Sequence, residues 1–312
     1  MEPHAGESLA DLLAGATEVL TAAGVADPAG DALALARFLI TEPGPLPGTA
    51  PAGFVSEFAG LVERRRLRVP LARILGRQHF RGLDLRVDSG VFLSRKQAES
   101  IAGAVIEEVR RLAGPVPHPV VVDLCTGSGA VALAVATEVP DARVIAVDLS
   151  PQAVALARWN DRRLNTRLLL IEQADATSAA TLTDRDGSID VVVANPPYIP
   201  PDGVPREIEV ADHDPAGALF GGGVDGLDTA RGMVATAARL LRPGGLLILE
   251  HADVQAARVR RLIASVGAFT PAVTHADEAG AQRYAAARRV GPKRFAAASI
   301  PVTGPGVKDS SP

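Results

Sequence analysis

Residues 120–129, with the sequence VVVDLCTGSG, decide the fold class of this chain. Val120–Leu124 is a short apolar run of the kind that a buried parallel strand requires. The glycines that follow allow a tight turn and let a ligand approach the main chain closely. A helix is expected over Ala130–Glu138, and its N-terminus adds free amides and positive potential to the turn. The stretch therefore predicts a strand–turn–helix unit with a ligand at the turn.

Strand and helix patterns alternate on the C-terminal side of this stretch. Ser150 and Pro151 supply an N-cap and a first-turn proline for a helix that reaches about Asn160. We predict further strands at 144–147, 168–171, 191–194 and 246–249, helices at 226–241 and 253–265, and an antiparallel pair at 270–273 and 284–287. Repeated βα units imply a doubly wound, mostly parallel sheet. The predicted fold class is α/β, Rossmann-like, with a C-terminal antiparallel hairpin.

The residues before this stretch have a helical pattern. Ala and Leu recur at helical spacing over 8–42, where Asp27-Pro28 is typical of a helix start, and another helix is predicted over 54–66. Alternating apolar residues predict a hairpin within 70–93. We therefore predict a helical N-terminal domain over 1–69, a hairpin linker over 70–96, a Rossmann-like domain over 97–290 and a disordered tail over 291–312.

The composition fits a soluble globular protein, with 47% hydrophobic and 22% charged residues. No apolar run reaches the length of a membrane span, and the acidic N-terminus lacks the pattern of a secretion signal. Cys125 is the single cysteine, so no intrachain disulfide is expected and a cytoplasmic location is predicted. The histidines show no metal-ligand spacing, and no metal is predicted.

The charge balance bears on the class of partner. A net charge of −4 argues weakly against a protein that binds bulk nucleic acid, and no stable nucleic acid partner is expected. One segment, residues 64–86, is nevertheless rich in arginine: Arg64, Arg65, Arg66, Arg68, Arg73, Arg77, Arg81 and Arg86. This arginine cluster is either a solvated helix face or a contact with an RNA-rich assembly or an acidic protein.

Two acidic residues narrow the choice of ligand for the glycine-rich turn. Asp148 ends the next predicted strand, where an acidic residue accepts hydrogen bonds from ribose hydroxyls in nucleotide-type sites. Gly127, Gly129 and Ala132 also satisfy the dinucleotide fingerprint, so both S-adenosylmethionine and a nicotinamide dinucleotide remain candidates. Asp175 favours S-adenosylmethionine, because it follows the 168–171 strand, where its side chain could bind an adenine amino group.

A second loop, Asn195-Pro196-Pro197-Tyr198, follows the apolar strand 191–194. In open α/β sheets ligands bind at the carboxyl ends of the strands. An amide or exocyclic amine nitrogen is a poor nucleophile, because its lone pair is delocalised into the neighbouring π system. The Asn195 side-chain carbonyl and the Pro196 backbone carbonyl could each accept one N–H, while the prolines stiffen the loop and Tyr198 offers a stacking surface. We expect catalysis by positioning, with Asn195 and Pro196 as the catalytic groups.

These motifs together resemble the HemK/PrmC-type protein-(glutamine-N5) methyltransferases. The resemblance rests on 123–129, Asp148, Asp175 and 195–198, and extends to 70–76 with Phe80, to 214–227, to 242–245 and to Glu250-His251. It covers roughly residues 60–290. The family methylates the glutamine of the Gly-Gly-Gln motif in peptide chain release factors, so the resemblance implies a protein substrate of that kind, held by the helical N-terminal domain.

The resemblance also assigns roles to individual residues. It implies that 195–198 grip the substrate glutamine and that S-adenosylmethionine is the methyl donor. The cofactor residues that it implies are Cys125, Thr126, Gly127, Ser128 and Gly129 for the methionine part, Asp148 and Leu149 at the ribose, Asp175 and Ala176 near the adenine, and Asn195.

Three departures from the family pattern indicate a divergent branch. Cys125 replaces a glycine, and cysteine does not adopt every glycine conformation cheaply. Ala176 stands where some members carry an aromatic residue that packs on adenine. The segment 94–99 keeps Arg95 and Glu99 of the family's Pro-Arg-x-x-Thr-Glu stretch but lacks its proline and threonine.

Other functions remain open at this stage. Methyltransferases that act on the amino groups of DNA or RNA bases use the same Asn-Pro-Pro-Tyr chemistry, although DNA enzymes need a basic surface to hold the strand. A nicotinamide-dependent oxidoreductase would use the turn and Asp148 but leaves 195–198 unexplained. A non-catalytic binding module is the third alternative.

Overall fold

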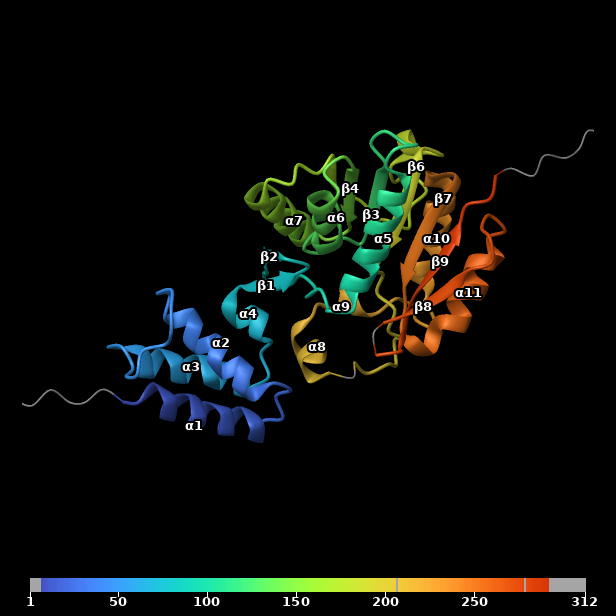
Figure 1. Cartoon of the computed structure of the whole chain (residues 1–312). Helices are drawn as coiled ribbons and strands as arrows, with labels where there is room; N and C mark the ends of the chain where they lie inside the picture. The colour runs from blue at the N-terminus through green and yellow to red at the C-terminus, as the bar shows by residue number, and fades with distance from the viewer. Residues whose placement is uncertain (1–6, 206, 278, 292–312) are drawn as a thin grey trace, which may run out of the picture.

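A computed structural model describes residues 7–205, 207–277 and 279–291 (Figure 1). Its centre is a seven-stranded sheet with the strand order β5-β4-β3-β6-β7-β9-β8. The strands are β3 (Val120–Leu124), β4 (Arg143–Asp148), β5 (Leu170–Gln173), β6 (Ile189–Ala194), β7 (Leu241–Glu250), β8 (Val273–Ala276) and β9 (Gln282–Arg288). Strands β3 to β7 pair in parallel, and β9 pairs antiparallel with both β7 and β8. The predicted α/β class with a C-terminal antiparallel pair is confirmed.

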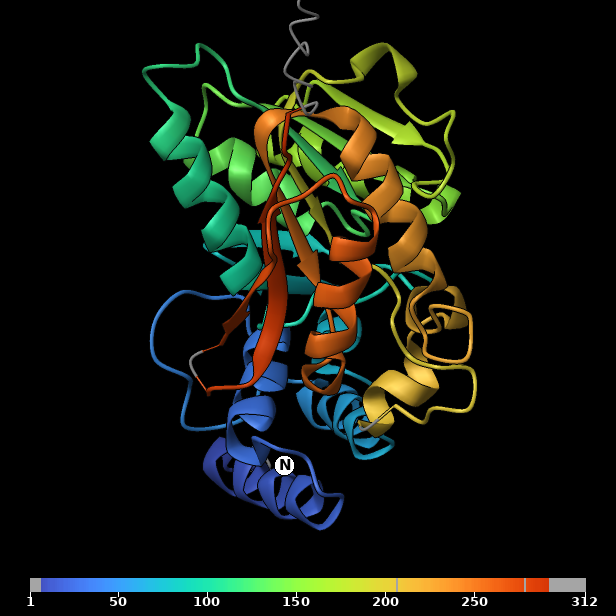
Figure 2. The same ribbon diagram turned by 90° about the vertical axis from the view of Figure 1, so that its right-hand side faces the viewer.

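Helices cover both faces of the sheet. Apolar residues of α5 (Ala98–Leu112), α6 (Ala130–Glu138) and α7 (Pro151–Leu164) pack on one face, and those of α10 (Asp228–Leu240) and α11 (Ala256–Ser265) pack on the other. Figure 2 shows α10 and α11 beside the strands in a view turned by 90°. Because both faces are covered, the central strands are apolar on both sides, as the runs at β3 and β6 predict.

The N-terminal helices form a hydrophobic cluster of their own. They are α1 (Leu9–Ala22), α2 (Pro28–Leu39), α3 (Phe54–Arg66) and the short α4 (Leu71–Leu75). Asp27 caps α2, with its side chain accepting from the Gly30 N–H, and Pro28 opens the helix as predicted. The hairpin β1 (Arg77–Phe80) and β2 (Leu83–Arg86) follows and packs against the α6 side of the sheet (Figure 1).

Several predicted boundaries were wrong. The 70–93 segment contains α4 before its hairpin, and α7 continues to Leu164, where Asn165 ends it in a left-handed conformation. The last pair lies at 273–276 and 282–288, not at 270–273 and 284–287. The 3-10 turn η1 (Thr183–Arg185) and the short helices α8 (Ile208–His213) and α9 (Ala216–Leu219) were not predicted. The first turn of the predicted 253–265 helix is the 3-10 turn η2 (Asp253–Gln255). Residues 292–312 of the predicted tail lie outside the described residues.

Most arginines of the cluster pair with carboxylates of the same chain. Six of its members form ion pairs with carboxylates: Arg65 with Asp31 and Glu209, Arg66 with Glu63, Arg68 with Glu209, Arg73 with Asp214, Arg81 with Glu138, and Arg86 with Asp88. The alternative of a solvated helix face is therefore wrong for Arg65 and Arg73, whose side chains are 8% and 9% exposed, whereas Arg66 and Arg86 remain about half exposed.

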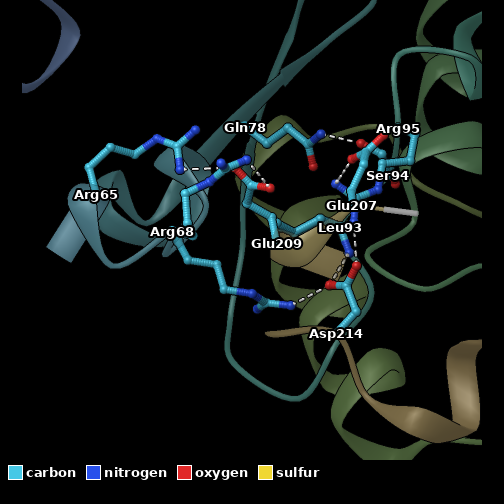
Figure 3. A network of polar contacts seen from close by, with 10 residues as sticks. Arg65, Arg68, Gln78, Leu93, Ser94, Arg95, Glu207, Glu209 and Asp214 are labelled. Carbon is cyan, nitrogen blue, oxygen red and sulfur yellow. Dashed lines mark hydrogen bonds and ion pairs between the residues drawn. The ribbon is translucent and has the colours of Figure 1, made fainter. Parts of the chain in front are cut away.

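Three of these ion pairs, made by Arg65, Arg68 and Arg73, tie the helical N-terminus to the loop that carries α8 and α9 (Figure 3). Arg68, just after α3, donates from Nε to Glu209 Oε1 over 2.8 Å and from Nη2 to Glu209 Oε2 over 2.7 Å. Arg73 Nη2 donates to Asp214 Oδ1 over 2.8 Å, and Arg95 donates to the other oxygen of Asp214. The side chain of Asp214 is 0% exposed, so this carboxylate is held entirely by protein groups.

No helix among the described residues is both long and apolar enough for a membrane crossing.

The Asp214 contact predicts a large stability effect. We expect Asp214→Ala to lower the free energy of unfolding by about 3–5 kcal/mol, because it leaves the nearly buried Arg73 without its counter-charge. The exposed Arg86–Asp88 pair is the matched control, and Asp88→Ala is expected to cost about 0–1 kcal/mol. Urea denaturation of both variants tests this, and equal losses would contradict the anchoring role of Asp214.

Candidate active site

A large cavity opens at the carboxyl edge of the parallel strands. The chain runs outward from β3 to β5 and returns to β6 beside β3, so the loops after β3 and β6 diverge at this switch point. The cavity has a volume of about 1240 Å³. A single drug-sized ligand occupies roughly 300–1,000 Å³, so this space suits a cofactor together with a substrate side chain. Its lining includes these predicted site residues: Cys125, Thr126, Gly127, Asp148, Leu149, Asp175, Ala176, Asn195, Pro196, Pro197 and Tyr198.

The glycine-rich turn is held in shape by Asp123. The Oδ2 atom of this buried carboxyl accepts from Thr126 Oγ1 over 2.7 Å and from the Ala132 N–H over 3.2 Å. Burial raises the pKa of Asp123 to about 7, and these hydrogen bonds and the charge of Asp148 modify it. Asp123 therefore joins both ends of the turn between β3 and α6.

Cys125 occupies a backbone conformation that suits glycine. Its φ is 68°, in the left-handed region, where a residue with a Cβ costs roughly 1–2 kcal/mol. The departure from glycine in the sequence therefore lies at a strained position. Burial and the charge of Asp148 raise the pKa of the Cys125 thiol, so it stays protonated and is not a nucleophile.

Asp148 links the ends of β3 and β4. Its Oδ2 accepts from the Gly127 N–H over 2.8 Å, and its Oδ1 accepts from the Ser150 N–H over 2.9 Å. Burial raises the pKa of Asp148, while these backbone N–H groups oppose the shift. Each carboxylate oxygen has further acceptor capacity on the cavity side, so the geometry fits a ligand that presents hydroxyl donors, as ribose does.

The remaining predicted cofactor residues divide into two groups. Asp175 is exposed in the cavity wall, and its Oδ1 accepts from the N–H and the hydroxyl of Thr177. Ala176 is buried beside it. Ser128 and Gly129 do not line the cavity: Ser128 is buried, and a Cβ on Gly129 would lie 2.9 Å from Leu133 Cδ1. The structure thus places these two behind the turn, where they support it.

Hydrogen bonds and close packing hold the Asn195–Tyr198 loop in place. The Ile199 N–H donates to the Leu219 carbonyl over 2.9 Å, and Gln255 Nε2 donates to the Tyr198 carbonyl over 2.8 Å. Gly226 packs so closely that an added Cβ would lie 2.4 Å from the Tyr198 carbonyl oxygen. Burial raises the pKa of Tyr198 to about 12, and the charge of Glu250 adds to the shift. The loop is therefore rigid and its tyrosine stays neutral.

The two expected acceptors are free. Among the described residues, no hydrogen bond engages the side chain of Asn195 or the carbonyl of Pro196, and both residues line the cavity. Asn195 is half-buried, and Pro196 is buried. Two acceptors that the protein leaves free at the end of β6 are suited to a ligand that brings N–H donors.

Sequence reasoning missed two residues of this site. Gln255 was not predicted because its role depends on carbonyls 57 and 30 residues away in the chain. Glu250 was noted only as part of the family resemblance, yet it lines the cavity at the end of β7. An acidic residue that ends a buried apolar strand next to the substrate loop is the signal that could have identified it.

Comparisons with known proteins agree with this geometry. Residues 116–283 match a family described as "Methyltransferase domain". The chain is 43% identical over 282 residues to the release factor glutamine methyltransferase of Streptomyces coelicolor, covering 90% of this chain and 98% of that relative. It is 41% identical over 286 residues to the enzyme of the same name from Mycolicibacterium smegmatis, covering 88% of this chain and 95% of that relative.

One relative carries a different name. The 4-amino-L-phenylalanine/4-methylamino-L-phenylalanine methyltransferase of Streptomyces pristinaespiralis is 38% identical over 272 residues, covering 86% of this chain and 91% of that relative. Seven relatives at 38–43% identity share the release factor name. On the strength of these matches over nearly its whole length, the chain belongs to the release factor glutamine methyltransferase family.

Proposed function

We propose that this enzyme transfers a methyl group from S-adenosylmethionine to the side-chain amide nitrogen, N5, of a glutamine in a protein, the Gly-Gly-Gln motif of a peptide chain release factor. The observation that carries the proposal is the pair of unengaged acceptors, the Asn195 side chain and the Pro196 carbonyl, in a rigid loop beside the glycine-rich turn. A primary amide nitrogen presents two N–H donors to match them. Release factors act in the cytoplasm, so the reaction takes place there.

The cofactor fits the residues of this cavity. Asp148 would hold the ribose hydroxyls, the backbone of 125–127 the methionine part, and Asp175 with Ala176 the adenine. S-adenosylmethionine supplies a methyl group already activated on a positively charged sulfur. What the chain adds is orientation: both substrate N–H bonds are fixed, so that the nitrogen lone pair faces the methyl group. Holding two reactants in this way contributes roughly 7–11 kcal/mol in favourable cases.

Substrates of a second class share this chemistry. The aryl amine on which the Streptomyces pristinaespiralis relative acts, by its name, also has two N–H donors and a delocalised lone pair. We favour the protein glutamine because seven of the relatives at 38–43% identity are named for it. A nucleic-acid base is disfavoured, because six residues of the arginine cluster are paired with carboxylates of the chain.

Mass spectrometry of the release factor decides between these substrates. After incubation with the enzyme and S-adenosylmethionine, we expect one added methyl on the glutamine of the Gly-Gly-Gln motif. A release factor with alanine at that glutamine is the control and should stay unmodified. Methylation of 4-amino-L-phenylalanine, or of RNA, without methylation of the release factor would reject the proposed substrate.

The Asn195 side chain is predicted to matter for turnover and not for the fold. We expect Asn195→Ala to lower kcat by about a hundredfold or more, because a substrate held by one acceptor leaves near-attack geometry. Cofactor affinity, measured by calorimetry, should change little. Near-wild-type turnover in this variant would contradict the role proposed for Asn195.

Asp148 is predicted to act on the cofactor. Hydrogen bonds to a charged group contribute about 1.5–3 kcal/mol, so we expect Asp148→Ala to raise the Kd for S-adenosylmethionine about tenfold to a hundredfold. Asp141→Ala is the matched control, since Asp141 is an exposed carboxylate just before β4, at the opposite edge of the sheet. Calorimetric titration measures both, and an unchanged Kd for the Asp148 variant would rule out the ribose contact.

A further inference from the structure

Glu250 lies beside the substrate loop. In the parallel pairing of β6 and β7, Ala194 is opposite Leu249, so Asn195 and Glu250 are the next residues on neighbouring strands. Neighbouring strands lie about 4.8 Å apart. Both residues line the same cavity, and Glu250 is close enough to Tyr198 for its charge to raise the pKa of that phenol.

The carboxyl of Glu250 differs from the others in this cavity. Most of those carboxyls accept a hydrogen bond from the protein: Asp123 from Thr126, Asp148 from Gly127, Asp175 from Thr177, Asp225 from Leu227 and Asp253 from Gln282. Glu207 is exposed and lies 4.0 Å from Arg95. Glu250 is 7% exposed, and its Oε2 has no hydrogen-bond partner among the described residues.

The charges around Glu250 compensate it only in part. Arg283 on β9 faces it, but its Nε is 2.6 Å from Asp277 Oδ2 and is committed to that ion pair. Tyr198 faces it from the substrate loop, Tyr284 is its register partner on β9, and Asp253 and Arg258 line the cavity nearby. An unpaired buried carboxyl is costly, and in a cavity it is a candidate for a functional group.

The proposed reaction requires an acceptor of this kind. An amide nitrogen that has gained a methyl group is positively charged and must release a proton. The Asn195 and Pro196 carbonyls are neutral amide oxygens that accept a hydrogen bond but do not retain a proton. A carboxylate both accepts the hydrogen bond and takes the proton.

Resting on the function proposed above, we propose that the Glu250 carboxylate shares with the neighbouring Asn195 carbonyl one of the two N–H groups of the substrate nitrogen and takes the proton that this nitrogen releases. The nitrogen gives its lone pair to the methyl carbon, and the carbon–sulfur bond breaks with its electrons going to sulfur. One N–H bond then breaks, its electron pair stays on nitrogen and its proton goes to Glu250. The products are the neutral N-methyl amide, the neutral thioether and the neutral carboxylic acid, which returns its proton to solvent.

The protonation of Glu250 gives this role a pH signature. Burial raises the pKa of Glu250 to about 8, and Arg283 opposes the shift. Because the deprotonated form is the acceptor, kcat/KM should rise with pH and level off above about 8. Burial also raises the pKa of two other carboxyls of the cavity, Asp123 to about 7 and Asp148, and both remain in every variant below.

The test is the pH profile of Glu250→Gln. We expect kcat to fall about a hundredfold or more at pH 8, as the loss of a general base does, with the Kd for S-adenosylmethionine unchanged and the rise with pH abolished. Glu250→Asp keeps a carboxylate and should recover part of the activity together with the rise. An unaltered profile in Glu250→Gln would overturn the proposal, because the rise then belongs to Asp123 or another group.

His251→Gln is the matched control. His251 is the next residue, is equally buried and also has a ring nitrogen, Nε2, without a partner among the described residues, but it does not line the cavity. Its kcat should stay within about threefold of wild type, since no acid–base step is removed. An equal loss in both variants would assign Glu250 a structural role.

The rates are compared on the release factor and on 4-amino-L-phenylalanine, so a wrong substrate and a wrong role for Glu250 give different results.

A measurement of thermal stability without substrate completes the test. A carboxyl whose pKa is raised in the folded state contributes stability that is full below its unfolded pKa, about 4.3, and is lost as pH rises through the folded value. The Tm of wild type should therefore fall relative to Glu250→Gln between about pH 5 and pH 8. A difference in Tm that is independent of pH would overturn the titration on which the proposal depends.

Discussion

The reversal of strand order between β3 and β6 is the constraint on which the site depends. Parallel strands place all their carboxyl ends at one edge, and the reversal makes the loops after β3 and β6 turn away from each other. Neither loop fills the space between them, so the strand order by itself leaves room for a cavity at the strand ends. The turn at 125–127 and the loop at 195–198 both line this cavity, because the carboxyl ends of β3 and β6 lie side by side at this edge of the sheet.

The polar groups of the site are of two kinds, those with and those without a hydrogen-bond partner in the protein. Asp123, Asp148 and Gln255 are engaged by the protein, and they fix the backbone of the two loops. Asn195, Pro196 and Glu250 have polar atoms that are not engaged by the described residues. Folding satisfies almost every buried polar group, so an unpaired polar atom that also lines the cavity is a candidate for contact with a ligand.

The sequence predicted correctly those elements whose formation depends on a few neighbouring residues. The apolar runs of β3 and β6, the Asp27 and Ser150 caps and the residues 195–198 each carry their signal within a few positions. The short helices α4, α8 and α9 carry none, because five residues or so cannot show a helical period. The ion pairs of the arginine cluster were not predicted for a related reason. Its partners Glu209 and Asp214 lie about 140 residues away, and no composition reveals such a pairing.

The anchoring of the α8 loop has a consequence for how ionic strength acts on this enzyme. Salt at physiological concentration screens exposed charges beyond about 8 Å, whereas buried pairs are screened far less. The side chains of Glu209 and Asp214 are only 13% and 0% exposed. Glu207 and Val210 of this loop line the cavity. The loop therefore keeps its attachment to the helical N-terminus at salt concentrations that weaken encounters between charged surfaces. A salt dependence of the reaction therefore reflects the association of enzyme and substrate, because the α8 loop itself stays anchored.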